Sequence, residues 1–509
     1  MKPTSSHRCG LCAFFLSIAL AVGAASPSVA ADPGSRRLPL EPCQIEGLEG
    51  GALCGTHEVW ENRTTRQGRK IGLKVVVLPA TGPEVAPDPL FLFAGGPGDG
   101  IASHAAGAAQ EYAELRKNRD VVMVDQRGTG GSHLLQCDVP GGEDDVQGYF
   151  EPAFSAEIAR RCRAELEKIA DLTQYTTTIA ADDLDEVRQW LGYGQINLEG
   201  ASYGTLAAQV YLRRYPQHVR TATLYGTAGI EQYLPFFHAR DGQRALDLLI
   251  EACLAEATCR GAFPNLRAEV REVLARLDRE RARAEVHLPG REGKTAVTIA
   301  RGPFAEQLRF LLYNPATSSL LPLVVHEAHR GNFEPFATLN VLWQSQIRRI
   351  LAFGMHLSVT CAEDLPFGDQ SRIGLLTEGT YLGDYRIRQQ LAACAEWPRA
   401  AIPPDFHQPV RSDVPVLLIS GNVDPVTPPF WAEETVRFLP RGRHFIVPDG
   451  HHGYGGLANP ECLLGVGRTF IERGEAESLD GACLSTMKRG PFVTSLEQFE
   501  GMLKAMMEG

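Results

Sequence analysis

Seven short runs of β-branched and large apolar residues constrain the fold of this chain most. They are LKVVVLP, PLFLFAG, DVVMVDQ, QINLEG, TATLYG, VPVLLIS and RHFIVPD. Between several of them lie stretches with helical apolar spacing, namely AAGAAQEYAELRKN, ADDLDEVRQWLGY and GTLAAQVYLRRYP. Nearly continuous apolar strands that alternate with helices are typical of a parallel sheet buried on both faces. The sequence therefore predicts an α/β fold with a mostly parallel central sheet flanked by helices.

The distribution of these runs along the chain predicts one interrupted domain. From about residue 230 to 405, amphipathic helical stretches such as RALDLLIEACLAEA predominate, and strand signals resume only at Val414. We therefore expect a core formed by residues 31–229 and 406–509, with residues 230–405 inserted as a helical cap. The arginine-rich stretch REVLARLDRERARAE predicts a solvated helix face within the insertion. Only ATGPEVAPD separates the first two strands, which favours an antiparallel pair.

The first thirty residues are typical of a secretory signal peptide. Lys2 and Arg8 precede an apolar block from Leu11 to Val22, and the small residues SPSVA follow it. The block is shorter than the roughly 20 apolar residues that a membrane anchor needs. We predict cleavage after Ala30, export to the periplasm or secretion, and no stable membrane insertion of the mature chain.

The cysteine content is consistent with export. Cys9 and Cys12 lie in the predicted signal peptide, and the ten others fall into sequential neighbours: 43 and 54, 137 and 162, 253 and 259, 361 and 394, 462 and 483. An even number of cysteines in an exported chain predicts disulfides. Nearest-neighbour pairing is the simplest connectivity, although the sequence leaves it open. No C-x-x-C pair remains in the mature chain, so we predict no zinc site.

The charge of the chain argues against nucleic acid and anionic membranes as partners. Loss of residues 1–30 removes two positive charges and no acid, so the formal net charge of −11 becomes −13. Both kinds of partner favour basic patches. The oligomeric state is not predictable from these features.

The segment GASYGT, residues 200–205, joins the apolar run INL to a helical stretch. G-A-S-Y-G matches the G-x-S-x-G nucleophile elbow, in which small flanking residues allow a strained turn to expose a serine at the end of a strand. A tight turn without chemistry would also use small residues. The position between a strand and a helix favours the chemical interpretation, with Ser202 as the nucleophile.

A serine nucleophile needs a base, and the base needs an orienting carboxylate, because a neutral hydroxyl reacts poorly at neutral pH. Asp424 lies in GNVDPVTPP, just past one predicted strand, and His451 and His452 follow the next. The order serine, acid, histidine is the one that accompanies a nucleophile elbow. Taken singly, an Asp before Pro is commonly a turn residue and a His in a glycine-rich loop is commonly just exposed. Together they predict a catalytic triad.

Acyl transfer also requires hydrogen-bond donors aimed at the oxyanion. One predicted donor is the backbone amide of Tyr203, directly after the nucleophile. The second is expected from LFLFAGGPGDG, where Gly95 and Gly96 allow close approach of the backbone, and we choose Gly96. A phosphate-binding loop is the alternative for this stretch, but neither G-x-x-x-x-G-K-[ST] nor G-x-G-x-x-G is present in it.

Five motifs together resemble the prolyl and tripeptidyl aminopeptidase group of α/β-hydrolases. They are AGGPG, DQRGTGGS, GASYGT, GNVDPVTPP and GHHG, in that order, and they extend over nearly the whole mature chain. The resemblance implies the α/β-hydrolase fold with a helical cap and a TAP-like C-terminal region. It also favours His452 over His451. Ala94 stands where many members have histidine, and the SYG around the nucleophile looks closer to the tripeptidyl branch.

The activity that this resemblance implies is that of a serine exopeptidase without metal or other cofactor. Such an enzyme removes one or a few residues from a peptide with a free N-terminus. Family members hold the α-ammonium group of the substrate with acidic residues near the cap, and the matching stretch here is SVTCAEDLP. Glu363 is the first candidate and Asp364 the second. The alternative for this stretch is a surface loop next to Cys361, and Glu199, beside the elbow, is interpreted as structural.

Two other functions are compatible with these residues. An esterase or another hydrolase of small acyl compounds would use the same fold and triad. A catalytically silent binding protein on this scaffold belongs to a different class, and the intact Ser202, Asp424 and His452 argue against it.

Overall fold

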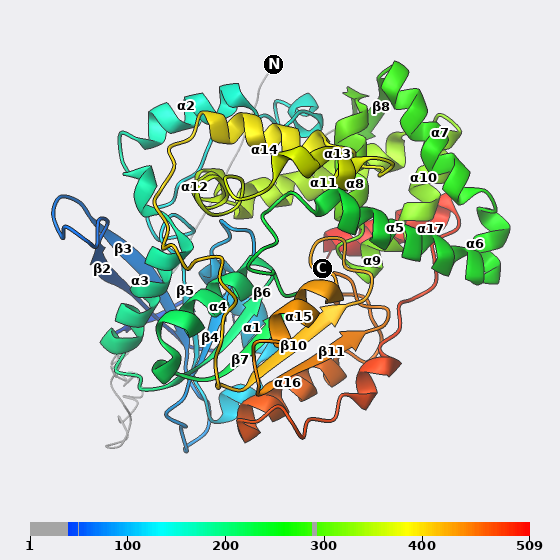
Figure 1. The fold of residues 1–509 in the computed structure, drawn as a ribbon. Coiled ribbons are helices and arrows are strands. Elements are labelled where there is room, and N and C mark those ends of the chain that lie inside the picture. Colours follow the sequence, from blue (N-terminus) through cyan, green and yellow to red (C-terminus); the bar gives the residue numbers. More distant parts are fainter. Residues whose placement is uncertain (1–38, 49, 288–292, 509) are drawn as a thin grey trace, which may run out of the picture. The chain divides into compact units, whose positions relative to one another are not determined.

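All seven predicted strands form, and they belong to one nine-stranded sheet (Figure 1). The computed structural model describes residues 39–48, 50–287 and 293–508, so the predicted signal peptide, with Cys9 and Cys12, lies outside the described residues. The strands of this sheet are β1 (Glu41–Cys43), β2 (Ala52–Trp60), β3 (Lys70–Leu78), β4 (Leu90–Phe93), β5 (Val121–Val124), β6 (Ile196–Ala201), β7 (Val219–Tyr225), β10 (Val416–Gly421) and β11 (Gly442–Val447).

The sheet is mostly parallel, as predicted. Its strand order is β1-β2-β3-β5-β4-β6-β7-β10-β11, and all neighbours from β5 to β11 are parallel. The predicted pairing of the first two runs is wrong, because β3 pairs antiparallel with β5, which lies between β3 and β4. Residues 79–89 connect β3 to β4. This link is long enough to cross over β5, because neighbouring strands in a sheet lie only about 5 Å apart. The first two predicted runs, which are neighbours in the sequence, are therefore not neighbours in the sheet.

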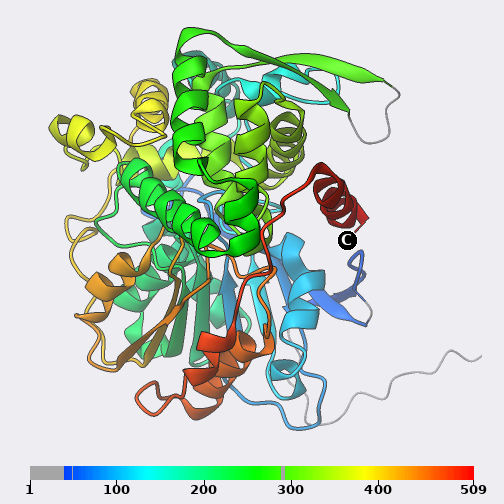
Figure 2. The ribbon, with the colours of Figure 1, turned by 90° about the vertical axis from the view of Figure 1, so that its right-hand side faces the viewer.

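Helices cover both faces of the sheet, which explains why its central strands are apolar along their whole length. Ala105 and Ala109 of α1 and Phe470 of α16 share one apolar cluster with Met123 and Leu417 of the strands. α3, α4 and α15 lie on the opposite face (Figures 1 and 2). These helices are α1 (Ala105–Glu111), α3 (Thr177–Trp190), α4 (Tyr203–Arg214), α15 (Pro429–Val436) and α16 (Glu461–Arg473).

The described residues between β7 and β10 add no strand to the central sheet and lie mainly in helices, which Figure 1 shows together beyond the carboxyl ends of β10 and β11. They are α5 (His238–Ala255), α6 (Ala257–Ala262), α7 (Leu266–Arg279), α8 (Arg301–Leu311), α9 (Pro315–Ser318), α10 (Leu321–His329), α11 (Glu334–Ile350), α12 (Phe353–Glu363), α13 (Ile373–Thr377) and α14 (Tyr385–Ala395).

An antiparallel hairpin, which was not predicted from the sequence, interrupts these helices. The hairpin pairs β8 (Ala282–His287) with β9 (Lys294–Ile299). Helix α7 ends at Arg279, so the predicted helix over REVLARLDRERARAE is wrong in its last residues. Val286 and Val297 pack in the apolar cluster of the surrounding helices, and this tertiary contact outweighs the local helical charge pattern.

Two segments outside residues 230–405 pack with the same helices. Phe492 and Phe499 share the apolar cluster of α5 to α11, and Phe499 belongs to α17 (Leu496–Glu508). Likewise α2 (Ala156–Leu166) contacts α14, and Arg160 of α2 forms an ion pair with Glu396. The division into core and cap at residues 230 and 405 stays a prediction, and these contacts make the packed helical layer larger than that segment.

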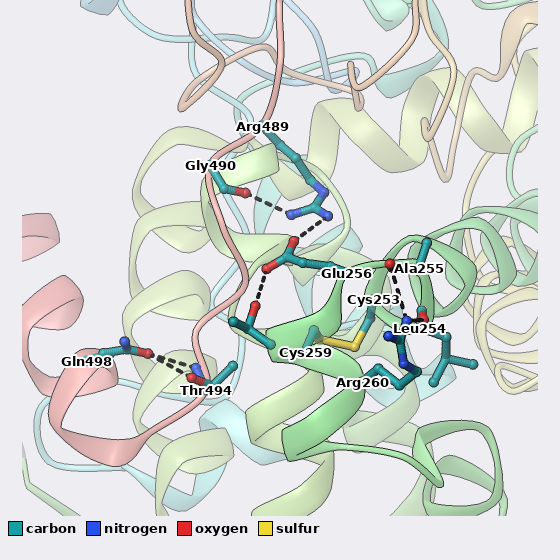
Figure 3. Close-up of a disulfide and its surroundings, with 11 residues drawn as sticks. Cys253, Leu254, Ala255, Glu256, Cys259, Arg260, Arg489, Gly490, Thr494 and Gln498 are labelled. Atoms are coloured by element: carbon teal, nitrogen blue, oxygen red, sulfur yellow. Dashed lines mark hydrogen bonds and ion pairs between the residues drawn. A yellow bond between two sulfur atoms is a disulfide. The ribbon is translucent and has the colours of Figure 1, made fainter.

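Five disulfides join the ten described cysteines, and each joins the sequential neighbours expected: Cys43–Cys54, Cys137–Cys162, Cys253–Cys259, Cys361–Cys394 and Cys462–Cys483. Figure 3 shows Cys253–Cys259 at the junction of α5 and α6, beside Glu256. The Glu256 carboxylate accepts a hydrogen bond of 2.9 Å from Arg489, which ties the C-terminal segment to these helices.

Among the described helices, none combines the length and the apolar character that a membrane span requires.

Candidate active site

Loops that follow five parallel strands meet at one edge of the sheet. The strand ends are held in register, because Phe93 pairs with Gly200, Ala201 and Ile419 both pair with Tyr225, and Gly421 pairs with Val447. Parallel strands in register present their carboxyl ends together. The loops that follow carry, in sheet order, Gly96, Ser202, Gly226, Asp424 and His452.

Ser202 occupies a strained turn between β6 and α4. Its φ of 56° and ψ of −125° are unusual for a residue with a side chain. A Cβ atom at Gly200 would collide with the carbonyl oxygen of Gly204, and one at Gly204 would collide with that of Phe93. Both glycines are therefore required by the turn. This is the local geometry that the elbow motif predicts.

Asp424 and His452 are in direct contact. His452 Nδ1 lies 2.9 Å from Asp424 Oδ2. The other oxygen, Oδ1, accepts hydrogen bonds from the backbone amides of Val426 at 2.7 Å and Thr427 at 2.8 Å. The Thr427 hydroxyl donates to Oδ2 at 2.7 Å. The carboxylate, which has no exposed surface, is therefore fixed by its own loop with one oxygen directed at the imidazole.

This environment keeps Asp424 ionised. Burial alone favours the neutral acid, but the nearby His452 and the hydrogen bonds from His452 and Thr427 outweigh it and hold the pKa of Asp424 below its usual value. An ionised carboxylate at Nδ1 stabilises the tautomer that carries its proton on Nδ1. The Nε2 atom of His452 is then left as a free base.

His451 has a structural environment instead. Its Nδ1 lies 2.8 Å from the carbonyl oxygen of Leu312 and its Nε2 lies 3.3 Å from Ser318 Oγ. Burial lowers the pKa of His451 to about 4, so the ring is neutral. The two adjacent histidines thus have separate partners, and no group of three or more His, Cys, Asp and Glu side chains suited to a metal ion occurs in the part of the chain that the structure describes.

Ser202 and His452 line the same cavity. Its volume is about 390 Å³, within the range of pockets for small ligands. No hydrogen bond joins Ser202 Oγ to His452 among the described residues. Contacts of this kind often shorten only when a substrate binds. Tyr313 packs edge-on against the imidazole, with 4.9 Å between the ring centroids, and so restricts its orientation.

The predicted oxyanion donors lie beside the serine. A Cβ atom at Gly95 would lie 3.4 Å from Ser202 Cβ, so the backbone of this loop passes directly along the nucleophile. Gly96 has a φ of 113°, which favours glycine. Tyr203 is the first residue of α4, and the N–H of a first helical residue has no partner within the helix. Gly96, Ser202 and Tyr203 line one smaller cavity that adjoins the larger one.

Glu363 has a protein partner. Its two oxygens accept hydrogen bonds of 2.6 Å from the backbone amide and the hydroxyl of Thr177, the first residue of α3. The Thr177 hydroxyl also lies 2.7 Å from the Tyr203 hydroxyl. A carboxylate at this position stabilises a helix N-terminus. Burial outweighs the hydrogen bonds of Thr177 and raises the pKa of Glu363 to about 7.

Neither Glu363 nor Asp364 lines the two cavities at Ser202. Burial, together with the neighbouring Glu363, raises the pKa of Asp364 well above its usual value. Their predicted role in binding an ammonium group stays a prediction. The alternative of a surface loop does not describe this stretch, because both side chains are buried.

Two residues beside the Asp424–His452 pair were not predicted from the sequence. The Thr427 hydroxyl lies 3.0 Å from His452 Nδ1. A Cβ atom at Gly226 would lie 2.9 Å from Thr427 Oγ1, so the glycine makes room for this contact. Gly226 is the last residue of the predicted strand run TATLYG. Its position at the carboxyl end of a strand could have marked it as a candidate site residue.

Two family models match the chain, and their ranges contain these residues. A model described as alpha/beta hydrolase fold matches residues 88–251, which include Gly96 and Ser202. A model described as TAP-like protein matches residues 379–483, which include Asp424 and His452. The chain has the α/β-hydrolase fold. Its C-terminal region is TAP-like, as the resemblance of the motifs implied.

Relatives of this hydrolase carry peptidase names. It is 25% identical to serine protease Hip1 of Mycobacterium tuberculosis over 428 residues, 76% of this chain and 80% of that protein. It is 29% identical to tripeptidyl aminopeptidase of Streptomyces lividans over 185 residues, 33% of this chain and 34% of that protein. A crystal structure of proline iminopeptidase from Mycobacterium smegmatis is 16% identical, with a TM-score of 0.41 and coverage of 82% of this chain and 98% of that chain. The family models and the named relatives identify the chain as a serine hydrolase.

Proposed function

We propose that this hydrolase is an exported serine aminopeptidase that cleaves short peptides near their free N-terminus through an acyl-enzyme. The observation that carries the proposal is the position of Ser202 and His452 at one cavity, with Asp424 hydrogen-bonded behind the imidazole. The peptidase names of the relatives support a peptide as the substrate.

In the proposed mechanism Ser202 is the nucleophile and His452 is the general base. His452 Nε2 takes the hydroxyl proton while Oγ attacks the scissile carbonyl, and Asp424 stabilises the imidazolium and keeps its tautomer. The amides of Gly96 and Tyr203 donate hydrogen bonds to the oxyanion. His452 then gives the proton to the leaving amine, and water, activated by the same base, hydrolyses the acyl-enzyme.

The walls of the cavity support a short substrate. Phe310 of α8 and Trp343 of α11 line it, and their rings are in contact, with 5.4 Å between centroids. Both helices therefore form part of the wall of the cavity at the serine. A peptide of a few residues matches a cavity of this size, whereas a folded protein is much larger.

Selection of a free N-terminus requires a carboxylate near the bound ammonium group. Glu363 and Asp364 are the candidates from the family resemblance, and Asp99 and Glu151 are carboxylates that line the cavity itself. Comparing Glu363→Gln, Asp364→Asn, Asp99→Asn and Glu151→Gln on a free and an N-acetylated peptide identifies the anchor. Replacing the anchoring carboxylate is expected to abolish the preference for the free amine. Replacing any of the other three carboxylates is not.

The five disulfides support export, since such bonds persist in oxidising compartments. Sequencing the N-terminus of the protein recovered from the periplasm and from the medium tests this part. We expect a mature chain that begins at Ala31. Recovery of the full-length chain from the cytoplasm alone would contradict export.

Three substrates test the activity itself: a peptidyl anilide with a free amine, the same compound N-acetylated, and a p-nitrophenyl ester. An aminopeptidase cleaves the first and leaves the second nearly untouched. An esterase prefers the third and does not respond to acetylation. A silent binding protein cleaves none and is not labelled by a fluorophosphonate, whereas we expect labelling that Ser202→Ala abolishes.

A further inference from the structure

Basic side chains gather where the two cavities beside Ser202 adjoin. Arg386, in the first turn of α14, and His238, at the start of α5, line both cavities. Arg309 of α8 lines the larger one. All three are buried, with exposed fractions of 8% for Arg386, 8% for His238 and 3% for Arg309. The acyl-transfer mechanism uses none of them.

One carboxylate is shared between the two arginines. Glu306 accepts a hydrogen bond of 2.6 Å from Arg309, while its distance to Arg386 Nε is 3.8 Å. No other described carboxylate forms an ion pair with Arg386. Its hydrogen bond of 2.7 Å goes to Gln390 Oε1, a neutral acceptor. The cluster therefore keeps an excess positive charge.

Arg127 in the same chain shows what a fully compensated buried arginine looks like. Its Nε and Nη2 donate to both oxygens of Asp183 at 2.6 and 2.9 Å. Its remaining donors reach the carbonyl oxygens of Glu61, Gln174 and Trp60. Arg386 lacks such a set of acceptors. Its guanidinium carbon also lies 4.1 Å from the centroid of the Phe154 ring, but an aromatic ring does not neutralise the charge as a carboxylate does.

His238, which lines both cavities together with Arg386, also lacks polar partners among the described residues. Within the part of the chain that the structure describes, neither ring nitrogen of His238 has a hydrogen-bond partner. Burial, followed by the charges of Arg309 and Arg386, holds the pKa of His238 well below its usual value, so the ring is neutral with one unused donor. Burial lowers the pKa of Arg386 to about 10, which indicates a cation short of anionic partners.

We infer that the pocket at Arg386 and His238 binds a carboxylate group of the substrate next to Ser202. Arg386 supplies the ion pair and His238 a hydrogen bond. Two sources of this group fit: an acidic side chain on the residue whose carbonyl Ser202 attacks, and the C-terminal carboxylate of a short peptide. The inference rests on the proposed peptidase function for its substrates, and it makes Arg386 a residue that determines specificity.

The test compares the wild type with Arg386→Gln and with a matched control, Arg388→Gln. Arg388 lies on the same helix, is exposed and pairs with Asp384 at 2.9 Å. The substrates are free-amine peptides in two matched pairs: Glu against Gln at the residue before the scissile bond, and a C-terminal acid against its amide. We expect the wild type to favour the acidic member of one pair in kcat/KM by at least about tenfold, as for hydrogen bonds to charged groups. The pair that responds identifies the source.

The variants decide whether Arg386 is responsible. Arg386→Gln is expected to bring the responding ratio to about one, and Arg388→Gln to keep the wild-type ratio. A ratio near one in the wild type for both pairs overturns the inference while cleavage of the neutral peptides upholds the peptidase. An unchanged ratio in Arg386→Gln also overturns it.

A second measurement needs no peptidase activity and no folded variant. Glutarate, a dicarboxylate, is expected to slow fluorophosphonate labelling of wild-type Ser202, and its neutral diamide, glutaramide, is not. If no peptide is cleaved, the proposed function fails, and this comparison still decides the carboxylate site. Equal protection by both compounds, or by neither, overturns the inference.

Discussion

Replacement of Asp424 by asparagine tests how the site is oriented. Oδ1 of Asp424 faces the backbone amides of Val426 and Thr427. An asparagine side chain must place its carbonyl oxygen there, because its NH₂ group opposite two N–H donors would leave each unpaired at about 1–3 kcal/mol. The NH₂ group of the new side chain then faces His452 Nδ1. This contact stabilises the tautomer with its proton on Nε2, which is unable to accept the Ser202 proton.

The expected loss is large and confined to the chemical step. Stabilising the wrong tautomer in such a triad reduces kcat by about 10⁴-fold, or about 5 kcal/mol of transition-state stabilisation. The backbone hydrogen bonds of the loop are retained, so Asp424→Asn is expected to remain folded. The assay is steady-state cleavage of a free-amine peptidyl anilide, together with thermal denaturation and the rate of fluorophosphonate labelling.

A matched control separates orientation from simple loss of a contact. Thr427→Val removes one hydrogen bond to Asp424 but leaves the carboxylate facing His452. We expect a reduction of about 10- to 100-fold, because the bond that is lost is a hydrogen bond to a charged carboxylate. If folded Asp424→Asn retains kcat within tenfold of wild type, or if Thr427→Val is equally impaired, the tautomer argument is refuted.

Three further predictions use the same assays. His452→Ala is expected to lower kcat by about 10⁶-fold. His451→Ala is expected instead to lower the free energy of unfolding by about 1–3 kcal/mol and to preserve labelling; the reverse pattern would exchange their roles. Because the pKa of Glu363 is raised from 4.5 to about 7 on folding, its contribution to stability is fully present below pH 4.5 and is lost as the pH rises through 7. Glu363→Gln is therefore expected to reduce the loss of unfolding free energy between pH 5 and 8, by about 3 kcal/mol at most, and an unchanged denaturation profile would contradict this. Gly226→Ala is expected to lower kcat, because the new methyl group would lie 2.9 Å from Thr427 Oγ1; kcat equal to wild type would show that the contact is unimportant.

Some strands were easier to predict from the sequence than others, because the strands differ in how deeply they are buried. β4, β5, β6 and β10 are buried on both faces and therefore read as continuous apolar runs. β2 is largely half-buried near the antiparallel edge, and its sequence ALCGTHEVW carries no such run. The β8–β9 hairpin is stabilised by pairing and by packing on neighbouring helices, so its strand character depends on contacts that local sequence does not contain.

The candidate site was predictable where its residues end strands. Ser202 directly follows β6, and Asp424 and His452 lie in the loops just past β10 and β11, so parallel register brings these positions to one edge. Thr427 was not predictable, since its contact with His452 depends on how one loop folds back upon itself. The carboxylate of Glu363 was expected at the substrate, and only the packing of α12 against α3 shows it bound to Thr177.

The sequence by itself determined the class of fold, the order of the motifs and the three residue types at the ends of the strands, because strand burial and turn sterics leave local patterns in the chain. The tertiary structure alone decided which histidine contacts Asp424, and it alone brought Arg386, Arg309 and His238 together beside Ser202. Those three residues come from three different helices, whose apolar spacing specifies a buried face but not its neighbours. Contacts between such helices are set by packing across long stretches of chain, and no local pattern records them.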